Sequence, residues 1–130
     1  MAAYPQEYRY SKEHEWVKVS GNKARIGITD YAQQELGDVV FVDLPSVGDT
    51  ITAGQPFAVV ESVKSVSDVY APVSGEIVAV NDHLSDSPEL INQSPHDEGW
   101  ICEVEMSNPA EVDELMTADE YQASVKSEAE

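Results

Sequence analysis

Cysteine is nearly absent from this chain of 130 residues. Cys102 is the only one, so no disulfide can form within the chain, and nothing indicates an oxidising compartment. It lies in the segment GWICEVEM, where strand alternation places Trp100, Cys102 and Val104 on one face. We therefore expect Cys102 to be a buried, small hydrophobic side chain.

Long apolar runs are also missing. The longest purely apolar stretch has only a few residues, far fewer than the roughly 20 that a membrane-spanning helix needs. The opening segment MAAYPQEYRY has no apolar core of the kind found in secretory signals. Together with the single cysteine, these absences predict a cytoplasmic protein.

Positive charge is scarce. The chain has a formal net charge of -18 and a pI near 4.2, so its field repels phosphate backbones and anionic lipid headgroups. Nucleic acid and membranes are therefore excluded as partners. The acidity serves either solubility or steering toward electropositive partner clefts, and the sequence leaves both readings open. A chain of this length fits one domain, residues 1–130, and a hydrophobic fraction of 42% argues against disorder.

Recognisable catalytic and metal-binding motifs are missing as well. The three histidines are far apart in the sequence, and the glycines are isolated, so neither a zinc motif nor a phosphate-binding loop is found. We interpret the segment from His96 to Glu98 as a solvated loop. No nucleophile stands beside an oriented base. The sequence therefore predicts neither a metal site nor an enzyme.

Short β-strands dominate what is present. EWVKV and KARIGI predict a hairpin, and VVFV, PFAVVESV, SVSDVYA and GEIVAV predict further strands. Between them, TDYAQQELG predicts a short helix that begins at a cap on Thr29 or Asp30 and ends at Gly37. We expect an N-terminal extension over residues 1–9, a C-terminal helical part over 108–126 and a frayed tail over 127–130.

One lysine stands out against this background. Lys64 is the only lysine or arginine between Ile26 and Val125. A lysine on a strand or turn is usually a solvated surface residue. Here strand segments flank it on both sides, beginning with Val63 and Val66. We therefore expect an exposed bend whose backbone is held rigidly by these strands and whose lysine amine is accessible. Such a bend would suit a carrier protein, because another enzyme could reach and modify the amine.

The motifs around Lys64 extend this interpretation. HEWV, GITDYAQQELGDVVFVDLP, VESVKSVSDVYAPVSGEIVAVN, SPELIN and GW follow one another from about Tyr10 to Tyr121, and together they resemble the H proteins of the glycine cleavage system. The resemblance implies a barrel-sandwich hybrid, like lipoyl domains, of two antiparallel sheets with short helices and a C-terminal helical part. It also implies lipoic acid in amide linkage to Lys64. Ser65 departs from the family, where alanine is common, and His96 stands where an aromatic residue is common.

The resemblance implies a role and a set of partners. The lipoyl group would receive the aminomethyl group of glycine from the P protein, a pyridoxal phosphate decarboxylase. The T protein, an aminomethyltransferase, would pass the carbon to tetrahydrofolate, and the L protein, dihydrolipoyl dehydrogenase, would reoxidise the arm. A separate enzyme would attach the lipoate. The chain itself would be a monomeric, non-catalytic carrier.

Four acidic residues match family positions with further roles. Glu15 and Asp68, with Glu13 as a weaker third, are the candidates that shelter the loaded arm, since carboxylates favour its ammonium group. The alternative is that all three are ordinary surface acids. Glu61 would help the attaching enzyme recognise the hairpin, or it is a solvated strand residue.

Two other functions stay open at this point. The chain could be a biotinyl or lipoyl carrier domain of an acyltransferase or carboxylase, although biotinyl hairpins usually flank the lysine with methionines and here the neighbours are Val63 and Ser65. It could also be an H-like lipoate relay or an acidic binding module without glycine cleavage activity.

Overall fold

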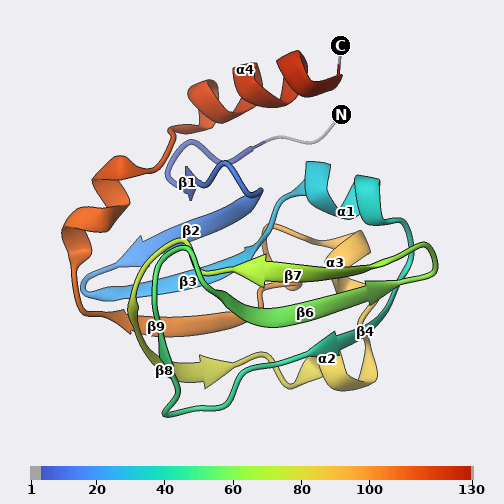
Figure 1. Ribbon diagram of the computed structural model, residues 1–130, viewed down its shortest axis with the longest axis horizontal. Helices are drawn as coiled ribbons and strands as arrows, with labels where there is room; N and C mark the ends of the chain where they lie inside the picture. Colours follow the sequence, from blue (N-terminus) through green and yellow to red (C-terminus); the bar gives the residue numbers. More distant parts are fainter. Residues whose placement is uncertain (1–3, 130) are drawn as a thin grey trace.

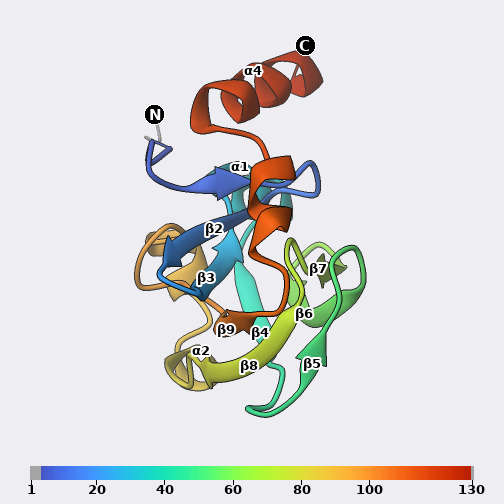
Figure 2. The same ribbon diagram turned by 90° about the vertical axis from the view of Figure 1, so that its left-hand side faces the viewer.

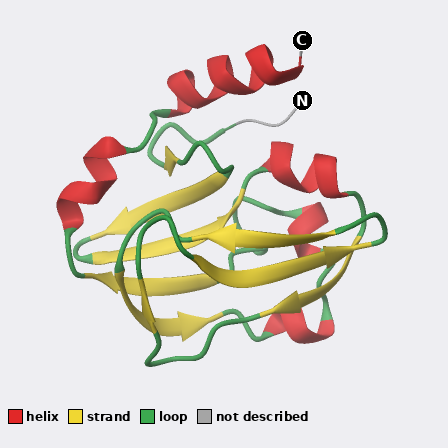
Figure 3. Cartoon of the chain, viewed as in Figure 1, coloured by secondary structure: helices red, strands yellow, loops and turns green. Residues whose placement is uncertain are grey.

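Two antiparallel β-sheets with short helices at their edges make up the protein (Figures 1 and 3). The computed structural model describes residues 4–129. Within them, a six-stranded sheet has the order β1-β2-β3-β9-β8-β5 and a three-stranded sheet the order β4-β6-β7. All strand pairs in this part of the chain are antiparallel. The predicted mainly β fold is thus confirmed.

The strands, in chain order, are β1 (Arg9–Tyr10), β2 (Glu15–Ser20), β3 (Lys23–Ile28), β4 (Val39–Asp43), β5 (Thr50–Ile51), β6 (Pro56–Ser62), β7 (Val66–Tyr70), β8 (Gly75–Val80) and β9 (Cys102–Met106). The helices are α1 (Asp30–Leu36), α2 (His83–Asp86), α3 (Leu90–Gln93), the 3-10 helix η1 (Pro109–Glu114) and α4 (Ala118–Ala129). Among these helices, none has the length and apolar character needed to cross a membrane.

Helix α1 begins and ends at residues that the sequence indicated. Thr29 is the N-cap, and its side chain accepts a hydrogen bond from the backbone N–H of Ala32 at 3.2 Å. Asp30, the other predicted cap, is instead the first helical residue, and its carboxylate accepts a bond from the Gln33 side chain at 2.9 Å. Gly37 ends the helix with a φ of 78°, a conformation that glycine adopts without steric cost.

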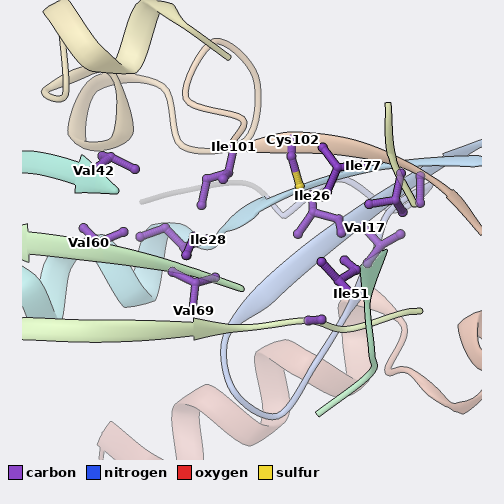
Figure 4. Packing of buried hydrophobic residues seen from close by; sticks show 14 of the residues in the cluster. Val17, Ile26, Ile28, Val42, Ile51, Val60, Val69, Ile77, Ile101 and Cys102 are labelled. Atoms are coloured by element: carbon purple, nitrogen blue, oxygen red, sulfur yellow. The ribbon is translucent and has the colours of Figure 1, made fainter. Parts of the chain in front are cut away.

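The main hydrophobic core lies between the two sheets (Figure 4). Val17 and Ile26 face it from the β2–β3 hairpin, and Val60 and Val69 face it from the β6–β7 hairpin. Each such side chain contributes about 1.5–3 kcal/mol when fully buried. Cys102 is fully buried in this cluster, as its place in the alternation predicted, and burial raises the pKa of its thiol.

A second cluster, built from aromatic side chains, lies on the outer face of the six-stranded sheet. Tyr10 and Tyr121 stack with ring centroids 4.9 Å apart, so they join β1 to helix α4. Trp16 is fully buried in the same cluster. Gly27 faces it across the β2–β3 hairpin, and a Cβ atom at Gly27 would lie 2.6 Å from the indole ring. Only glycine therefore allows the ring to lie flat on this strand.

The structure describes part of each predicted terminal segment. In the predicted extension over residues 1–9, Tyr4 already packs on Tyr121 with ring centroids 5.4 Å apart, and residues 1–3 lie outside the described part. In the C-terminal part, η1 is a 3-10 helix. Helix α4 runs through Ala129, so it includes three of the four residues predicted to fray, while Glu130 lies outside the described residues.

Candidate functional site

Lys64 lies at the exposed turn between β6 and β7, at the bend that the sequence predicted. The turn is closed by a hydrogen bond from the Ser62 N–H to the Ser65 carbonyl at 2.8 Å. The Ser62 hydroxyl oxygen accepts two further bonds, from the N–H groups of Lys64 at 3.2 Å and Ser65 at 3.1 Å. Serine thus holds a turn that lacks the usual Asn-Gly or Asp-Gly pair. The amine is accessible while its backbone is fixed.

The loop between α1 and β4 supports this turn from one side, and Figure 1 shows the two next to each other. The Val63 N–H donates to the Asp38 carbonyl at 3.0 Å. Gly37 lies against the lysine stem, since a Cβ atom there would be 3.1 Å from Lys64 Cε. The base of the side chain is therefore held by a backbone bond and by a close contact.

A pocket of about 330 Å³ lies between α1, β7 and the start of β2. It begins close to the Lys64 turn, because it includes Leu36, next to Gly37, and Ser67, one residue into β7. Apolar and acidic side chains share its wall. The apolar ones are Ile28, Ala32, Leu36, Val60 and Val69; the acidic ones are Glu13, Glu15, Glu35 and Asp68.

Glu15 is the buried acid of this pocket, with only 2% of its surface exposed. The Ser11 hydroxyl donates to one carboxylate oxygen at 2.5 Å, and the Tyr70 N–H donates to the other at 3.2 Å. Burial raises the pKa of Glu15 to about 7, while these two hydrogen bonds act in the opposite direction. The carboxyl group therefore takes up a proton at a higher pH than a solvated glutamate does.

The structure brings three of the four predicted acidic residues together. Glu13, Glu15 and Asp68 line this one pocket, although Glu13 and Asp68 are exposed and Glu15 is not. Glu61 is not among the pocket residues. It is half-buried on β6, where its strand partners are Val66 and Phe41.

Sequence reasoning missed several pocket residues. Tyr31 and Glu35 come from α1 and are four residues apart, a spacing that places them on one helix face and could have identified this wall. His14 also lines the pocket, with a φ of 72° that is unusual for a residue with a side chain. Its Nδ1 lies 2.7 Å from the Tyr121 hydroxyl, which is also 2.7 Å from Thr29 Oγ1. Helix α4 thereby contacts one residue of the pocket wall.

His96 corrects the interpretation of residues 96–98 as a solvated loop. Its Nε2 accepts a hydrogen bond from the Asp30 N–H at 3.0 Å, and its carbonyl accepts one from the Tyr8 hydroxyl at 2.8 Å. Asp97 and Glu98 are exposed, as expected. His96 instead satisfies the first N–H of α1, one of the donors that a helix leaves without an internal partner. Within residues 4–129, no group of three or more potential ligands is placed to hold a metal ion.

Comparison with known proteins identifies the family. The family model for the glycine cleavage H-protein matches residues 8–128. The glycine cleavage system H protein of Halalkalibacterium halodurans is 57% identical over 128 residues, covering 98% of this chain and 100% of the relative. The H protein of Geobacillus thermodenitrificans is 60% identical over 121 residues, covering 93% and 95%.

A solved structure agrees with these relatives. The crystal structure of a glycine cleavage system H protein from Mycobacterium marinum superposes with a TM-score of 0.85 at 41% identity, covering 92% of this chain and 97% of that one. The predicted barrel-sandwich hybrid is thereby confirmed. The family model, the related sequences and the superposed structure agree, and the chain belongs to the glycine cleavage H-protein family.

Proposed function

We propose that this chain is the lipoylated swinging-arm carrier of glycine decarboxylation, with lipoic acid in amide linkage to Lys64. One observation carries the proposal: the only lysine or arginine in a hundred consecutive residues lies at the exposed tip of a well-held hairpin in a member of this family. When bound, the group supplies a disulfide that can accept a one-carbon unit and be closed again by redox exchange.

The residues present fit such an arm. Lys64 has an exposed side chain, as an attaching enzyme requires. Asp68 follows it by four residues along β7, a distance of roughly 13 Å in an extended chain. A lipoyl-lysine arm has about a dozen bonds of roughly 1.5 Å, and each advances only about 1.2 Å along the zigzag chain, so the arm reaches roughly 14 Å. The arm could therefore reach the pocket.

The pocket suits both parts of a loaded arm. Its apolar wall, which includes Leu36 and Val69, matches the hydrocarbon and sulfur part of the group. Its acids match an aminomethyl ammonium, with Asp68 and Glu13 at the exposed rim and Glu15 inside. An ammonium beside Glu15 favours the ionised carboxylate and so opposes the effect of burial. We propose that these residues shelter the loaded carbon from water.

The same proposal names the partners. The arm would be loaded by the P protein, unloaded by the T protein and reoxidised by the L protein, after a lipoate-attaching enzyme has recognised the hairpin with help from Glu61. The net charge of -18 supports steering toward electropositive clefts on these enzymes. The chain would be a monomeric carrier that supplies position rather than catalysis. The buried, unpaired Cys102 supports a cytoplasmic location.

Mass spectrometry of the protein from its native source tests this function. We expect an intact mass increased by one lipoyl group, and a digest that places the group on the peptide containing Lys64. A biotin adduct on that peptide would support the carboxylase-type carrier instead. An unmodified protein in cells that lipoylate other substrates would contradict the proposal and favour the relay or binding module.

A further inference from the structure

We propose that Asn92 is a positioning residue for Lys64, acting through the loop between α1 and β4. The proposal rests on the proposed function, because it concerns the attachment of the arm and the direction in which the arm leaves the protein. Asn92 lies on the one-turn helix α3, remote in sequence from the β6–β7 turn.

The side-chain amide of Asn92 makes three hydrogen bonds around a single loop. Its Nδ2 donates to the Gly37 carbonyl at 2.9 Å and to the Gln33 side-chain oxygen at 2.9 Å. Its Oδ1 accepts from the Val39 N–H at 2.9 Å. One amide thus binds a side chain from the middle of α1, the residue that terminates the helix and the first residue of β4.

The loop held in this way contacts Lys64 at two points. The Asp38 carbonyl, between the two backbone groups that Asn92 binds, accepts the Val63 N–H at 3.0 Å. Gly37 lies under the lysine stem, within 3.1 Å of Cε when measured from the position of a Cβ atom. A shift of the loop therefore moves both the backbone of the turn and the path of the side chain.

Asn92 also fixes the turn relative to the pocket. Gln33, to which it donates, belongs to α1, and the same helix supplies Tyr31, Glu35 and Leu36 to the pocket wall. The amide therefore couples the base of the arm to the wall that would receive it. Neither β-hairpin geometry nor the Ser62 bonds provide this link, since both are confined to the β6–β7 turn.

Asparagine can make all three of these hydrogen bonds, whereas aspartate and alanine cannot. Two acceptors and one donor surround the amide, so the side chain must donate twice and accept once. An aspartate at position 92 could still accept from Val39 but would bring a negative charge to two oxygen atoms. An alanine would make none of the three bonds.

Loss of the three Asn92 hydrogen bonds should reduce the fraction of molecules in which the β6–β7 turn has the conformation that the attaching enzyme binds. An apparent dissociation constant rises in inverse proportion to the competent fraction. The KM for lipoate attachment should therefore rise while kcat stays unchanged, because the competent molecules react as before. A residue with a merely structural role would lower the stability of the protein without changing KM.

The test uses Asn92→Ala and Asn92→Asp, with Asn81→Ala as the matched control. Asn81 also makes three bonds through its amide: Nδ2 donates to the carbonyls of Glu98 at 2.8 Å and Trp100 at 2.9 Å, and Oδ1 accepts from the His83 N–H at 3.3 Å. Asn81 is more buried than Asn92, so its loss should cost at least as much stability. Its bonds involve no part of the α1–β4 loop.

Two measurements are made on each variant: amide hydrogen exchange at Val63 in the unmodified protein, and steady-state kinetics of lipoate attachment. For both Asn92 variants we expect faster exchange at Val63 and a KM raised about ten-fold at unchanged kcat. For Asn81→Ala we expect exchange and KM within about two-fold of the parent protein. If the Asn92 variants do not fold, Gln33→Ala removes one of the three bonds and should shift both readings in the same direction by a smaller factor.

Exchange at Val63 and KM that match those of the Asn81 variant would overturn the inference. Failure of the proposed function gives a different pattern, in which neither the parent protein nor Asn81→Ala accepts lipoate at all. Exchange at Val63 in the unmodified protein would still decide the role of Asn92 in that case.

Discussion

The two sheets differ in what covers their outer faces. On the six-stranded sheet, the aromatic cluster around Trp16 is buried beneath helix α4 and the N-terminal segment, as the view in Figure 2 shows for α4 above β1 and β2. On the three-stranded sheet, Phe41 and Val66 stay 48% and 67% exposed beside the turn that holds Lys64. The outer face of the six-stranded sheet is therefore packed, whereas the outer face of the three-stranded sheet is open to solvent, although both sheets contribute to the core between them.

Lys64→Arg should separate function from fold most completely. Arginine keeps the positive charge, but its guanidinium does not form the amide that the proposed lipoyl group requires. We expect lipoylation and glycine decarboxylation to be lost while the thermal midpoint is unchanged. Mass spectrometry, a reconstituted decarboxylation assay and a melting curve make the comparison. Lipoylation at another residue of the variant would contradict the assignment of Lys64.

Trp16→Ala should have the largest effect on stability. The side chain is fully buried and its indole N–H donates to the Pro95 carbonyl at 2.8 Å, so its removal should cost roughly 3–5 kcal/mol of unfolding free energy. Denaturant unfolding measures the loss. A cost below about 1 kcal/mol would show that the aromatic cluster is not the stabilising element proposed here.

Glu15 should make stability depend on pH. Its pKa is raised from 4.5 to about 7 in the folded protein, so the folded state binds the proton more tightly than the unfolded chain. Its stabilising contribution is therefore complete below about pH 4.5 and is lost as the pH rises to about 7, a change of about 3 kcal/mol.

Glu15→Gln keeps the shape of the side chain and removes its titration. Unfolding free energies of parent and variant, measured between pH 4.5 and 7.5, should converge at the acidic end and diverge as the pH rises, with the variant more stable. Other carboxylates affect both proteins equally, so only the difference reports on Glu15. Parallel curves would refute the buried titration.

Asp68→Ala should have a smaller, functional effect. The carboxylate lies at the exposed rim of the pocket, and an ion pair at such a site is worth about 0.2–1 kcal/mol. Loss of the carbon from loaded protein should therefore be faster by about 1.4- to 5-fold, with folding unchanged. Asp43→Ala removes an exposed acid of the same sheet outside the pocket and serves as the control. Equal decay rates in the two variants would exclude the shelter role.

Val66→Ala should have the smallest effect. The side chain is largely exposed on the open sheet, so we expect the unfolding free energy to change by less than about 0.5 kcal/mol. Denaturant unfolding of Val66→Ala and Trp16→Ala compares the free-energy cost of a truncation on the outer face of each sheet. A cost of several kcal/mol would mean that the open face is packed in solution.

Local patterns were sufficient to predict much of the fold. Strand alternation indicated the β2–β3 hairpin and the buried Cys102, and the capping signals at Thr29 and Gly37 gave the ends of α1. The exposed bend at Lys64 followed from the strand segments on either side of it. Each of these signals lies within a few neighbouring residues.

Contacts between distant residues were beyond such patterns. The bond between His96 and the Asp30 N–H joins positions 66 apart, and those from Asn92 to the α1–β4 loop span more than 50. The raised pKa of Glu15 arises from burial between the sheets, where its carboxylate also accepts a hydrogen bond from the Tyr70 N–H on the other sheet. These features depend on how the two sheets pack, so a local motif contains no sign of them.

The buried position of Cys102 has a chemical consequence for the proposed lipoyl carrier. A disulfide is attacked by thiolates, and both solvent access and the ionised fraction control the rate. Cys102 has neither access nor an appreciable ionised fraction, since it is fully enclosed and its pKa is raised by burial. The thiol of Cys102 therefore does not react with the proposed dithiolane, so the scaffold itself does not exchange sulfur atoms with it.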